Sequence, residues 1–513
     1  MEEKRAQSRS RSKIINVKRF DIGNSVSHEK IRMELNNDIF DHVNNRINNE
    51  VLQKIETPSM KNEKFLHSSE KYRDKRKSSK KDALPDKEFL VRESLLTDLF
   101  EVPHIRTIYN LCIIFFISII FNTVVTDIME SRTIRVGNNA LLIGFTKFSM
   151  CTYTWLFMQA STLSVYVPFT LWAHGRQQFL PKSSIQKFWD YGWLSAFVLY
   201  QVLFLVFPVK VVSEEDFSIG CSLIIIMEQM RMMMKTHAFV RTVAPRFLSY
   251  KPHSETPPAI VPKFSQYLYF LFVPTLVYRD EYPRTNEIRW TVVIRNFVEV
   301  GVCIFCLAFI VERFIIPIYY TFDTQPRDWK SFIKNIVESS FIGVLLLIIA
   351  QYLLLHSWMN AWAEMLRFAD RLFYKDWWNS TTYREFYRTW NLVVHDWLYT
   401  YIYKDMYDIV VPGNRSLSAI TVFLVSAIFH EYMFAFTLRF FYPVLFILFA
   451  GIGLIMFFVS KYVTSNIFVW MSWAFGNGIM LSLYTMETHA RWNNCPPHSN
   501  YYLDLFIPRS WSC

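Results

Sequence analysis

Long apolar runs alternate with short polar connections along most of this chain. Each run approaches or exceeds the roughly 20 residues that an α-helix needs to cross a bilayer. The pattern therefore predicts an all-α polytopic membrane protein with about nine transmembrane helices. They are expected at about Thr107–Val125, Leu141–Trp172, Trp189–Val209, Phe217–Val240, Trp290–Tyr320, Phe332–Trp358, Leu417–Leu438, Tyr442–Val463 and Asn466–Met486. The second run is too long for one upright span, which predicts a tilted or extended helix.

The first 100 residues have a different pattern. Residues 8–12 alternate Ser and Arg, a composition typical of disorder. Between about residues 28 and 55, apolar side chains recur mostly at steps of three and four, as in an amphipathic helix. Two interpretations stay open: an oligomerisation helix that packs against another copy, or a helix that rests on the membrane domain or the membrane surface. We divide the chain into a cytosolic, partly disordered N-terminal region, 1–100, and a membrane domain, 101–513.

Composition supports the membrane assignment. Hydrophobic residues make up 52% and charged residues 19% of the 513 positions, whereas soluble domains carry about 25% charged residues. A formal net charge of +11 would suit a nucleic-acid-binding protein, but no nucleic-acid motif occurs, so no such partner is expected. Basic residues gather instead in the connections after the second, fourth and sixth spans, and the positive-inside rule places these connections in the cytosol.

This charge distribution also predicts the topology. With nine spans, a cytosolic N-terminus puts the C-terminus in the lumen. Segment 359–416 is then a cytosolic or interfacial segment, and residues 488–513 form a lumenal tail. An oxidising lumen would allow Cys495 and Cys513 of that tail to form a disulfide.

His430 is the main candidate for chemistry. It lies within the apolar run Leu417–Leu438, where an ionisable side chain is costly and therefore indicates function. Desolvation favours the neutral imidazole, which can accept a proton from a hydroxyl that attacks an activated acyl group. Exclusion of water would protect the acyl donor from hydrolysis. The alternative is a structural histidine, hydrogen-bonded between helices.

Polar residues upstream of this histidine are candidate partners. The amide of Asn391 could donate to a developing oxyanion, or the residue could cap a helix or a turn. His395 follows one helical turn later, on the same face. Arg388 and Arg415 could bind the phosphates of an anionic donor, or they could supply ordinary loop charge. Phe373–Asn379 mixes aromatic and polar residues, which predicts either a wall over the donor's entrance or an anchor at the membrane interface.

Several motifs of this chain match a known family. The motif FYxDWWN stands at Phe373, Tyr374, Asp376, Trp377, Trp378 and Asn379, and an intramembrane histidine stands at His430 within SAIFHEY. At these residues the sequence resembles the membrane-bound O-acyltransferase (MBOAT) superfamily. Diacylglycerol acyltransferases share FYxDWWN, but HDWLY from His395 and YRDEYP from Tyr278 resemble the sterol O-acyltransferases (acyl-CoA:cholesterol acyltransferases). The likeness runs from about Glu88 to Cys513.

The resemblance implies a fold, a location and a site. It implies the MBOAT fold with about nine transmembrane helices, in the endoplasmic reticulum membrane, assembled as a homodimer or homotetramer. Long-chain acyl-CoA would enter from the cytosol and sterol from the membrane. His430 would be the catalytic base and Asn391 its partner. The residues expected at acyl-CoA are Arg388, Asn391, His395, Tyr403, Arg415 and Ser426, and His104 is expected near sterol.

Three functional hypotheses follow. The leading one is transfer of a long-chain fatty acyl group from acyl-CoA to a sterol hydroxyl, which gives a steryl ester and free CoA. The second is acylation of diacylglycerol or another lipid alcohol. The third is a lipid transporter or scaffold, in which His430 relays protons or is structural. No cofactor is expected, because acyl-CoA is a substrate, and no metal is expected, because neither HExxH nor paired Cys/His spacing occurs.

Overall fold

The structure is a computed structural model that describes residues 84–130, 132–249, 259–319, 329–460, 462–492 and 495–511. The residues from Asp86 to the C-terminus belong to one compact unit. The amphipathic segment 28–55 and most of the predicted N-terminal region lie outside the described residues, so the oligomerisation helix stays a prediction.

Helices form nearly all of the described chain. The long elements, with the 3-10 or π-helical segments written η, are α4 (Pro103–Glu130), α6 (Phe148–Ser164), α7 (Tyr166–Gln178), α8 (Ser184–Glu214), α9 (Ile219–Leu248), α11 (Trp290–Ile310) continued by η1 (Val311–Ile315) and α12 (Ile316–Tyr319), α13 (Trp329–Gln351) continued by η2 (Tyr352–Trp358) and α14 (Met359–Met365), α17 (Arg415–Leu438), α18 (Val444–Phe446) continued by η6 (Ile447–Gly453) and α19 (Leu454–Val459), and α20 (Asn466–Trp492). The short elements are α3 (Leu95–Leu99), α5 (Asn138–Gly144), α10 (Phe264–Phe272), η3 (Trp377–Asn379), α15 (Tyr383–Thr389), α16 (Leu392–Leu398), η4 (Tyr399–Tyr403), η5 (Met406–Val410), α21 (Tyr501–Phe506) and η7 (Arg509–Trp511). In the described part of the chain, extended pairing is limited to two isolated bridges.

Six helical stretches are long and apolar enough to cross a membrane. They are Pro103–Glu130, Ser184–Glu214, Trp290–Tyr319, Trp329–Met365, Arg415–Leu438 and Asn466–Trp492. The apolar helix Val444–Val459 is shorter, and α9 carries Glu228, Arg231 and Lys235. The all-α membrane fold is therefore confirmed, while the count of nine spans stays a prediction.

The predicted second span differs from a single tilted helix. The structure divides it into α5, α6 and α7. Lys147, between α5 and α6, has a φ of 63°, which is the left-handed conformation and cannot continue a right-handed helix. The apolar pattern runs through this break because both sides of it are apolar, so hydropathy alone does not detect it.

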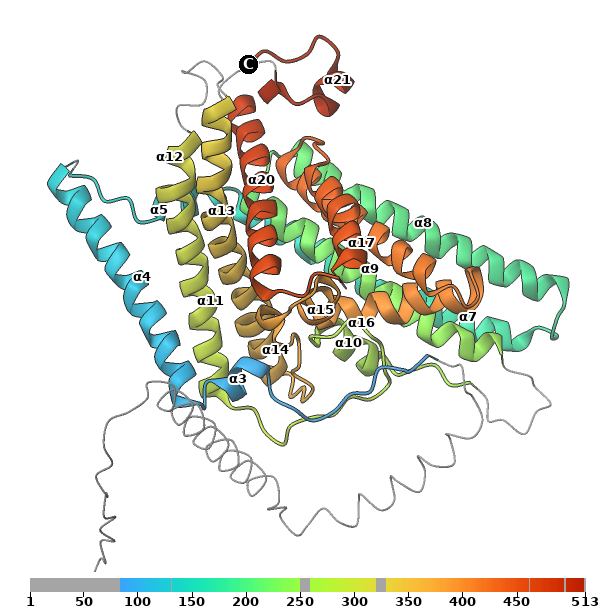
Figure 1. Ribbon diagram of the computed structural model, residues 1–513. Helices are drawn as coiled ribbons and strands as arrows, with labels where there is room; N and C mark the ends of the chain where they lie inside the picture. The colour runs from blue at the N-terminus through green and yellow to red at the C-terminus, as the bar shows by residue number, and fades with distance from the viewer. Residues whose placement is uncertain are drawn as a thin grey trace, which may run out of the picture. The chain divides into compact units, whose positions relative to one another are not determined.

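α13 and α20 pack against each other at close range. A Cβ atom added to Gly478 of α20 would lie 2.0 Å from Ser340 Oγ and 2.6 Å from the carbonyl oxygen of Ile336, both on α13. Only glycine permits this approach, as is common where helices pack in membranes. Figure 1 shows α11, α13 and α20 side by side, with α17 next to them.

α20 also connects two opposite ends of the unit that begins at Asp86. At its start, Asn466 Nδ2 donates to the carbonyl oxygens of Trp378 (2.8 Å) and Ser380 (3.0 Å). At its other end, the buried carboxylate of Glu487 accepts from Arg491 Nε at 2.6 Å and from the backbone N–H of Ser510 at 2.9 Å. A helix of this length spans about 40 Å. The FYxDWWN segment and the C-terminal tail therefore lie at opposite ends (Figure 1).

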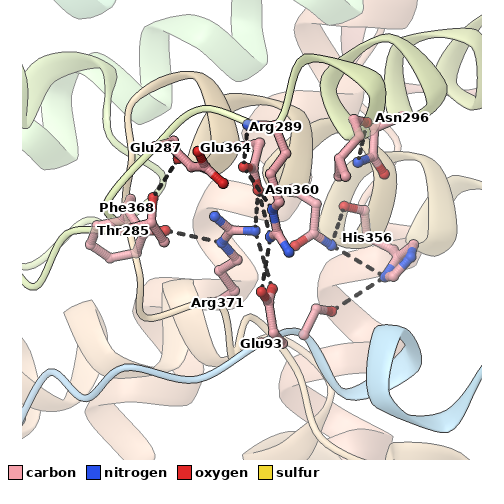
Figure 2. A network of polar contacts seen from close by, with 12 residues as sticks. Glu93, Thr285, Glu287, Arg289, Asn296, His356, Asn360, Glu364, Phe368 and Arg371 are labelled. Carbon is pink, nitrogen blue, oxygen red and sulfur yellow. Dashed lines mark hydrogen bonds and ion pairs between the residues drawn. The ribbon is translucent and has the colours of Figure 1, made fainter. Parts of the chain in front are cut away.

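A buried ion network holds the segment that follows α14. Glu364 is 0% exposed and Arg371 is 2% exposed, and Arg371 Nη1 lies 2.5 Å from Glu364 Oε2. Arg289 Nη2 lies 2.8 Å from the same oxygen and 2.9 Å from Glu93 Oε1. Figure 2 shows both guanidinium groups directed at the two carboxylates. Because buried charges need partners, this network fixes the chain on either side of α14.

Candidate active site

One ring nitrogen of His430 makes a hydrogen bond within its helix, and the other has no hydrogen-bond partner among the described residues. It lies on α17, where its Nδ1–H donates to the carbonyl oxygen of Ser426 at 2.6 Å, and the Ser426 hydroxyl lies 3.4 Å from the same nitrogen. A proton on Nδ1 leaves the lone pair on Nε2, the tautomer that acts as a base. Among the described residues none hydrogen-bonds to Nε2, and the residue keeps part of its surface exposed. The geometry therefore presents a neutral proton acceptor.

Aromatic rings connect His430 to α15. The imidazole stacks on Phe449 of η6, with ring centroids 5.2 Å apart. Phe449 lies 5.4 Å from the ring of Tyr387 on α15, and both contact Phe423 of α17. Gly453 permits this packing, because a Cβ there would lie 2.7 Å from the Tyr387 hydroxyl. α15 is thereby held against the helices that surround the histidine.

Glu431, the neighbour of the histidine, faces elsewhere. Its carboxylate accepts from the backbone N–H of Phe446 at 3.0 Å and from the hydroxyl of Tyr484 at 3.2 Å. These bonds tie α17 to α18 and α20. Glu431 therefore has a structural role, in agreement with the roughly 100° between successive residues on a helix.

Asn391 is the N-cap of α16. Its Oδ1 accepts from the backbone N–H of Val394 at 3.1 Å, which satisfies one of the unpaired donors of the first helical turn. The cap uses the oxygen alone and leaves both Nδ2–H donors without a partner among the described residues. The start of the helix is held further by the backbone N–H of Leu392, which donates to the carbonyl oxygen of Phe373 at 2.9 Å. No hydrogen bond joins Asn391 to His430 in the described chain.

A column of stacked rings follows Asn391. The rings of His395, Tyr399, Tyr403 and Tyr407 lie 6.4, 5.6 and 6.2 Å apart in sequence, with interplanar angles of 4°, 15° and 7°. Two of the residues predicted to contact acyl-CoA, His395 and Tyr403, thus belong to one continuous face. η4 and η5, which carry most of this column, pack against α17, the helix of Ser426 and His430.

The two arginines predicted for the donor lie at helix ends. Arg388 is near the end of α15 and Arg415 is the first residue of α17. Both are exposed, and neither is paired with a carboxylate in the described part of the chain. Their guanidinium groups are therefore free to bind an anion.

No described contact joins His104 to the other candidate site residues. It is the second residue of α4, it is exposed, and no described contact joins it to His430. Its predicted place near sterol stays a prediction.

The FYxDWWN motif lies mostly in the core. Phe373, Tyr374 and Trp377 are 2%, 3% and 6% exposed, whereas Asp376 and Asn379 are exposed and Trp378 is partly exposed. The Trp377 ring contacts five other aromatic rings, those of Trp378, Trp390, Trp470, Trp473 and Phe386, at 4.5 to 6.1 Å. The hydroxyl of Tyr374 lies 2.8 Å from His356 Nδ1 and 3.3 Å from Ser94 Oγ. The motif thus joins the segment after α14 to α15 and α20.

We expect Tyr374→Phe to lower stability more than catalysis. It removes a buried hydrogen bond, which costs about 1–2 kcal/mol, while the ring keeps its packing. Thermal unfolding of the purified protein in detergent should show the loss, and the rate per folded molecule should stay within about twofold of wild type. A large fall in that rate at unchanged stability would instead give the motif a direct part in the chemistry.

Two further predictions concern cysteines and metals. Cys495 is buried, and its predicted partner, Cys513, lies outside the described residues, so the disulfide stays a prediction. Over the described ranges, no three His, Cys, Asp or Glu side chains converge as metal ligands.

Sequence reasoning missed the contacts that hold these residues in place. The stack of Phe449 on His430, the buried pair of Glu364 with Arg371, and an ion pair between Lys87 and Asp396 (2.7 Å) join segments that are far apart in the chain. The one signal was the presence of charged residues in a largely apolar region, and it did not indicate their partners.

Comparison with known proteins identifies the family. The family model described as "MBOAT, membrane-bound O-acyltransferase family" matches residues 195–486, more than half of the chain. The chain is similar to sterol O-acyltransferase 1 of Mus musculus (42% identical over 83% of this chain and 79% of the relative) and of Chlorocebus aethiops (42%, 83% and 77%). It is also similar to sterol O-acyltransferase 2 of Homo sapiens (37%, 83% and 80%). This chain belongs to the membrane-bound O-acyltransferase family, in its sterol O-acyltransferase branch.

Proposed function

We propose that this protein transfers a long-chain fatty acyl group from acyl-CoA to the hydroxyl of a sterol. His430 Nε2 takes the hydroxyl proton, the sterol oxygen attacks the thioester carbonyl carbon, the C–S bond breaks, and CoA leaves as a thiol. The products are a steryl ester and free CoA. The observation that carries this proposal is the hydrogen bond from His430 Nδ1 to the Ser426 carbonyl oxygen, 2.6 Å long, which directs the basic lone pair to Nε2.

Asn391 is proposed as the partner of the base. In the reaction, negative charge develops on the thioester oxygen, and a positioned N–H donor stabilises it. Asn391 Nδ2 is available for this task because Oδ1 alone makes the cap. The cap in turn fixes the orientation of the amide, so the structural and catalytic roles of this side chain are compatible.

Acyl-CoA is proposed to lie along α15, α16, η4 and the start of α17. Arg388 and Arg415 supply unpaired guanidinium groups that can bind phosphates. The ring column that includes His395 and Tyr403 offers flat surfaces, and Ser426 lies beside the base. His104 is proposed near the sterol. No cofactor takes part, since the donor is activated as a thioester before it binds.

The orientation of the protein in the membrane and its cellular location are also proposals. Lys375 lies within the FYxDWWN segment, Arg384 lies on the following helix α15, and α20 leads from that segment to the C-terminal tail. By the positive-inside rule the FYxDWWN end faces the cytosol and the tail faces the lumen. We place the protein in the endoplasmic reticulum membrane as a homodimer or homotetramer.

An acceptor panel tests the proposal. Purified protein in detergent is incubated with labelled oleoyl-CoA and, in separate reactions, with a set of sterols, diacylglycerol and a long-chain alcohol. We expect labelled steryl ester as the main product. Labelled triacylglycerol as the main product would show that the acceptor is a glyceride and not a sterol. If no acceptor gave an ester, a transporter or scaffold would be favoured.

A further inference from the structure

An extended arm before α3 is bound to the segment that follows α14. The arm comprises residues 86–94. The backbone N–H of Arg92 donates to the carbonyl oxygen of Ala369 (2.9 Å), and the carbonyl oxygen of Arg92 accepts from the backbone N–H of Arg371 (3.0 Å). The Arg92 guanidinium also pairs with buried Asp370, with Nε at 2.5 Å from Oδ1. The C-terminal half of the arm is therefore fixed in place.

The N-terminal half of the arm reaches α16 through one side chain. Lys87 Nζ lies 2.7 Å from Asp396 Oδ2 and 4.0 Å from Asp370 Oδ2. The side chains of Lys87 and Asp396 are only 17% and 22% exposed, so water and salt screen this pair less than a surface pair. Burial alone would raise the pKa of Asp396, but neighbouring His395 and Lys87 outweigh it and lower that pKa below its usual value. The pair is therefore ionic at neutral pH.

Asp396 is well placed to fix two of the proposed acyl-CoA contacts. α16 has only seven residues, so its cap Asn391, His395 and Asp396 move as one body. His395 Nδ1 lies 3.6 Å from Asp396 Oδ1, and the His395 ring is parallel to that of Tyr399. The imidazole is therefore oriented by Asp396 and by the next turn of the chain. Leu392 and Trp397 anchor other faces of that helix, through their N–H groups to the carbonyl oxygens of Phe373 and Met234.

We infer that Lys87 is a positioning residue for the acyl donor. Through Asp396 it holds α16 in the place where Asn391 and His395 meet acyl-CoA, and through Arg92 the rest of the arm is attached to the buried core. Lys87 acts through this ion pair and does not contact the reacting atoms. This inference rests on the proposed function, because it assigns a role within the same reaction.

The test is a double-mutant cycle with separate KM values for the two substrates. For Lys87→Met we expect the KM for acyl-CoA to rise roughly tenfold, since displacement of bound groups by about 1 Å has effects of this size or larger. The kcat should fall as well, because the proposed oxyanion donor Asn391 moves with α16, whereas the KM for sterol should stay within about twofold of the wild-type value. Asp396→Asn should give a similar rise, and the double variant should be no worse than either single variant, since both remove one interaction.

Two matched variants separate position from charge. Lys87→Arg keeps the positive charge and should restore the KM for acyl-CoA to near the wild-type value. Glu88→Gln changes the next residue of the arm, which is exposed and has no partner among the described residues, and should leave both KM values unchanged. Thermal unfolding confirms that each variant is folded. If Lys87→Met does not fold, Asp396→Asn and Lys87→Arg decide in its place.

The outcomes are distinct from those that bear on the proposed function. A wild-type KM for acyl-CoA in folded Lys87→Met and Asp396→Asn would overturn the inference while esterification itself stands. Additive effects in the double variant, or an equal rise of both KM values, would also overturn it, because they indicate general loosening of the structure. Absence of steryl ester from the wild-type protein would instead refute the proposed function.

Discussion

His430→Ala is expected to lower the rate of steryl ester formation by at least about 10³-fold, within the range that general bases contribute. The variant loses the only group in the described site that is both unprotonated at Nε2 and bonded at Nδ1 to a fixed carbonyl oxygen. The remaining alanine fits the helix, because Ala has the highest helix propensity. Initial rates with labelled acyl-CoA and sterol measure the loss, and size-exclusion chromatography checks that the variant keeps its assembly.

His489→Ala provides a control with the same local chemistry. His489 lies on α20 near its C-terminal end, and its Nδ1 also pairs with the carbonyl oxygen four residues earlier, that of Thr485, at 2.9 Å. Its ring contacts those of Trp492 and Tyr319 at tilted angles, and no described contact joins it to the residues proposed to bind the substrates. We expect its rate to stay within about threefold of wild type. Equal losses of esterification rate in His430→Ala and His489→Ala would show that His430 has only a structural role.

Asn391 is expected to show two separable roles. Asn391→Asp keeps an N-cap oxygen of about equal quality but removes the Nδ2–H donors, so ester formation should fall by about 10²–10³-fold without loss of stability. Asn391→Ala removes both the N-cap oxygen and the Nδ2–H donors. It should show the same fall in rate together with a loss of about 1 kcal/mol in stability. Initial rates and thermal unfolding, measured on the same preparations, distinguish the two roles.

Asn414→Asp is the matched control for the Asp substitution. Asn414 caps α17 in the same manner, with Oδ1 accepting from the backbone N–H of Leu417 at 3.0 Å. The change introduces a carboxylate at a cap that is not assigned to catalysis, and we expect activity within about threefold of wild type. If Asn391→Asp were as active as Asn414→Asp, the amide of Asn391 would be a cap and not a catalytic donor.

Apolar patterning predicts the helices of this protein well, because lipid and core both select apolar side chains. Pro103–Glu130, Arg415–Leu438 and Asn466–Trp492 each include a predicted span. The same pattern does not detect the break at Lys147 between α5 and α6, since that break depends on one backbone conformation. The pattern also predicts a span at Tyr442–Val463 that is about as long as its neighbours, although the helix there, Val444–Val459, is shorter.

The site is predictable to the extent that its chemistry is local. His430 stands out because it is ionisable in an apolar run, and its bond to Ser426 follows from the spacing of one helical turn. The cap formed by Asn391 was an open alternative, and the structure establishes that cap. Phe449 and the ion pair of Lys87 with Asp396 were not predictable, because such contacts depend on how distant segments pack.

The most direct test of direct, base-assisted transfer is a single turnover with one equivalent of labelled acyl-CoA on the purified wild-type protein. We expect the label to stay on CoA until sterol is added, and then to appear in steryl ester at the rate at which free CoA thiol appears. Label bound covalently to the protein before sterol is added would contradict the proposed attack of the sterol oxygen on the thioester.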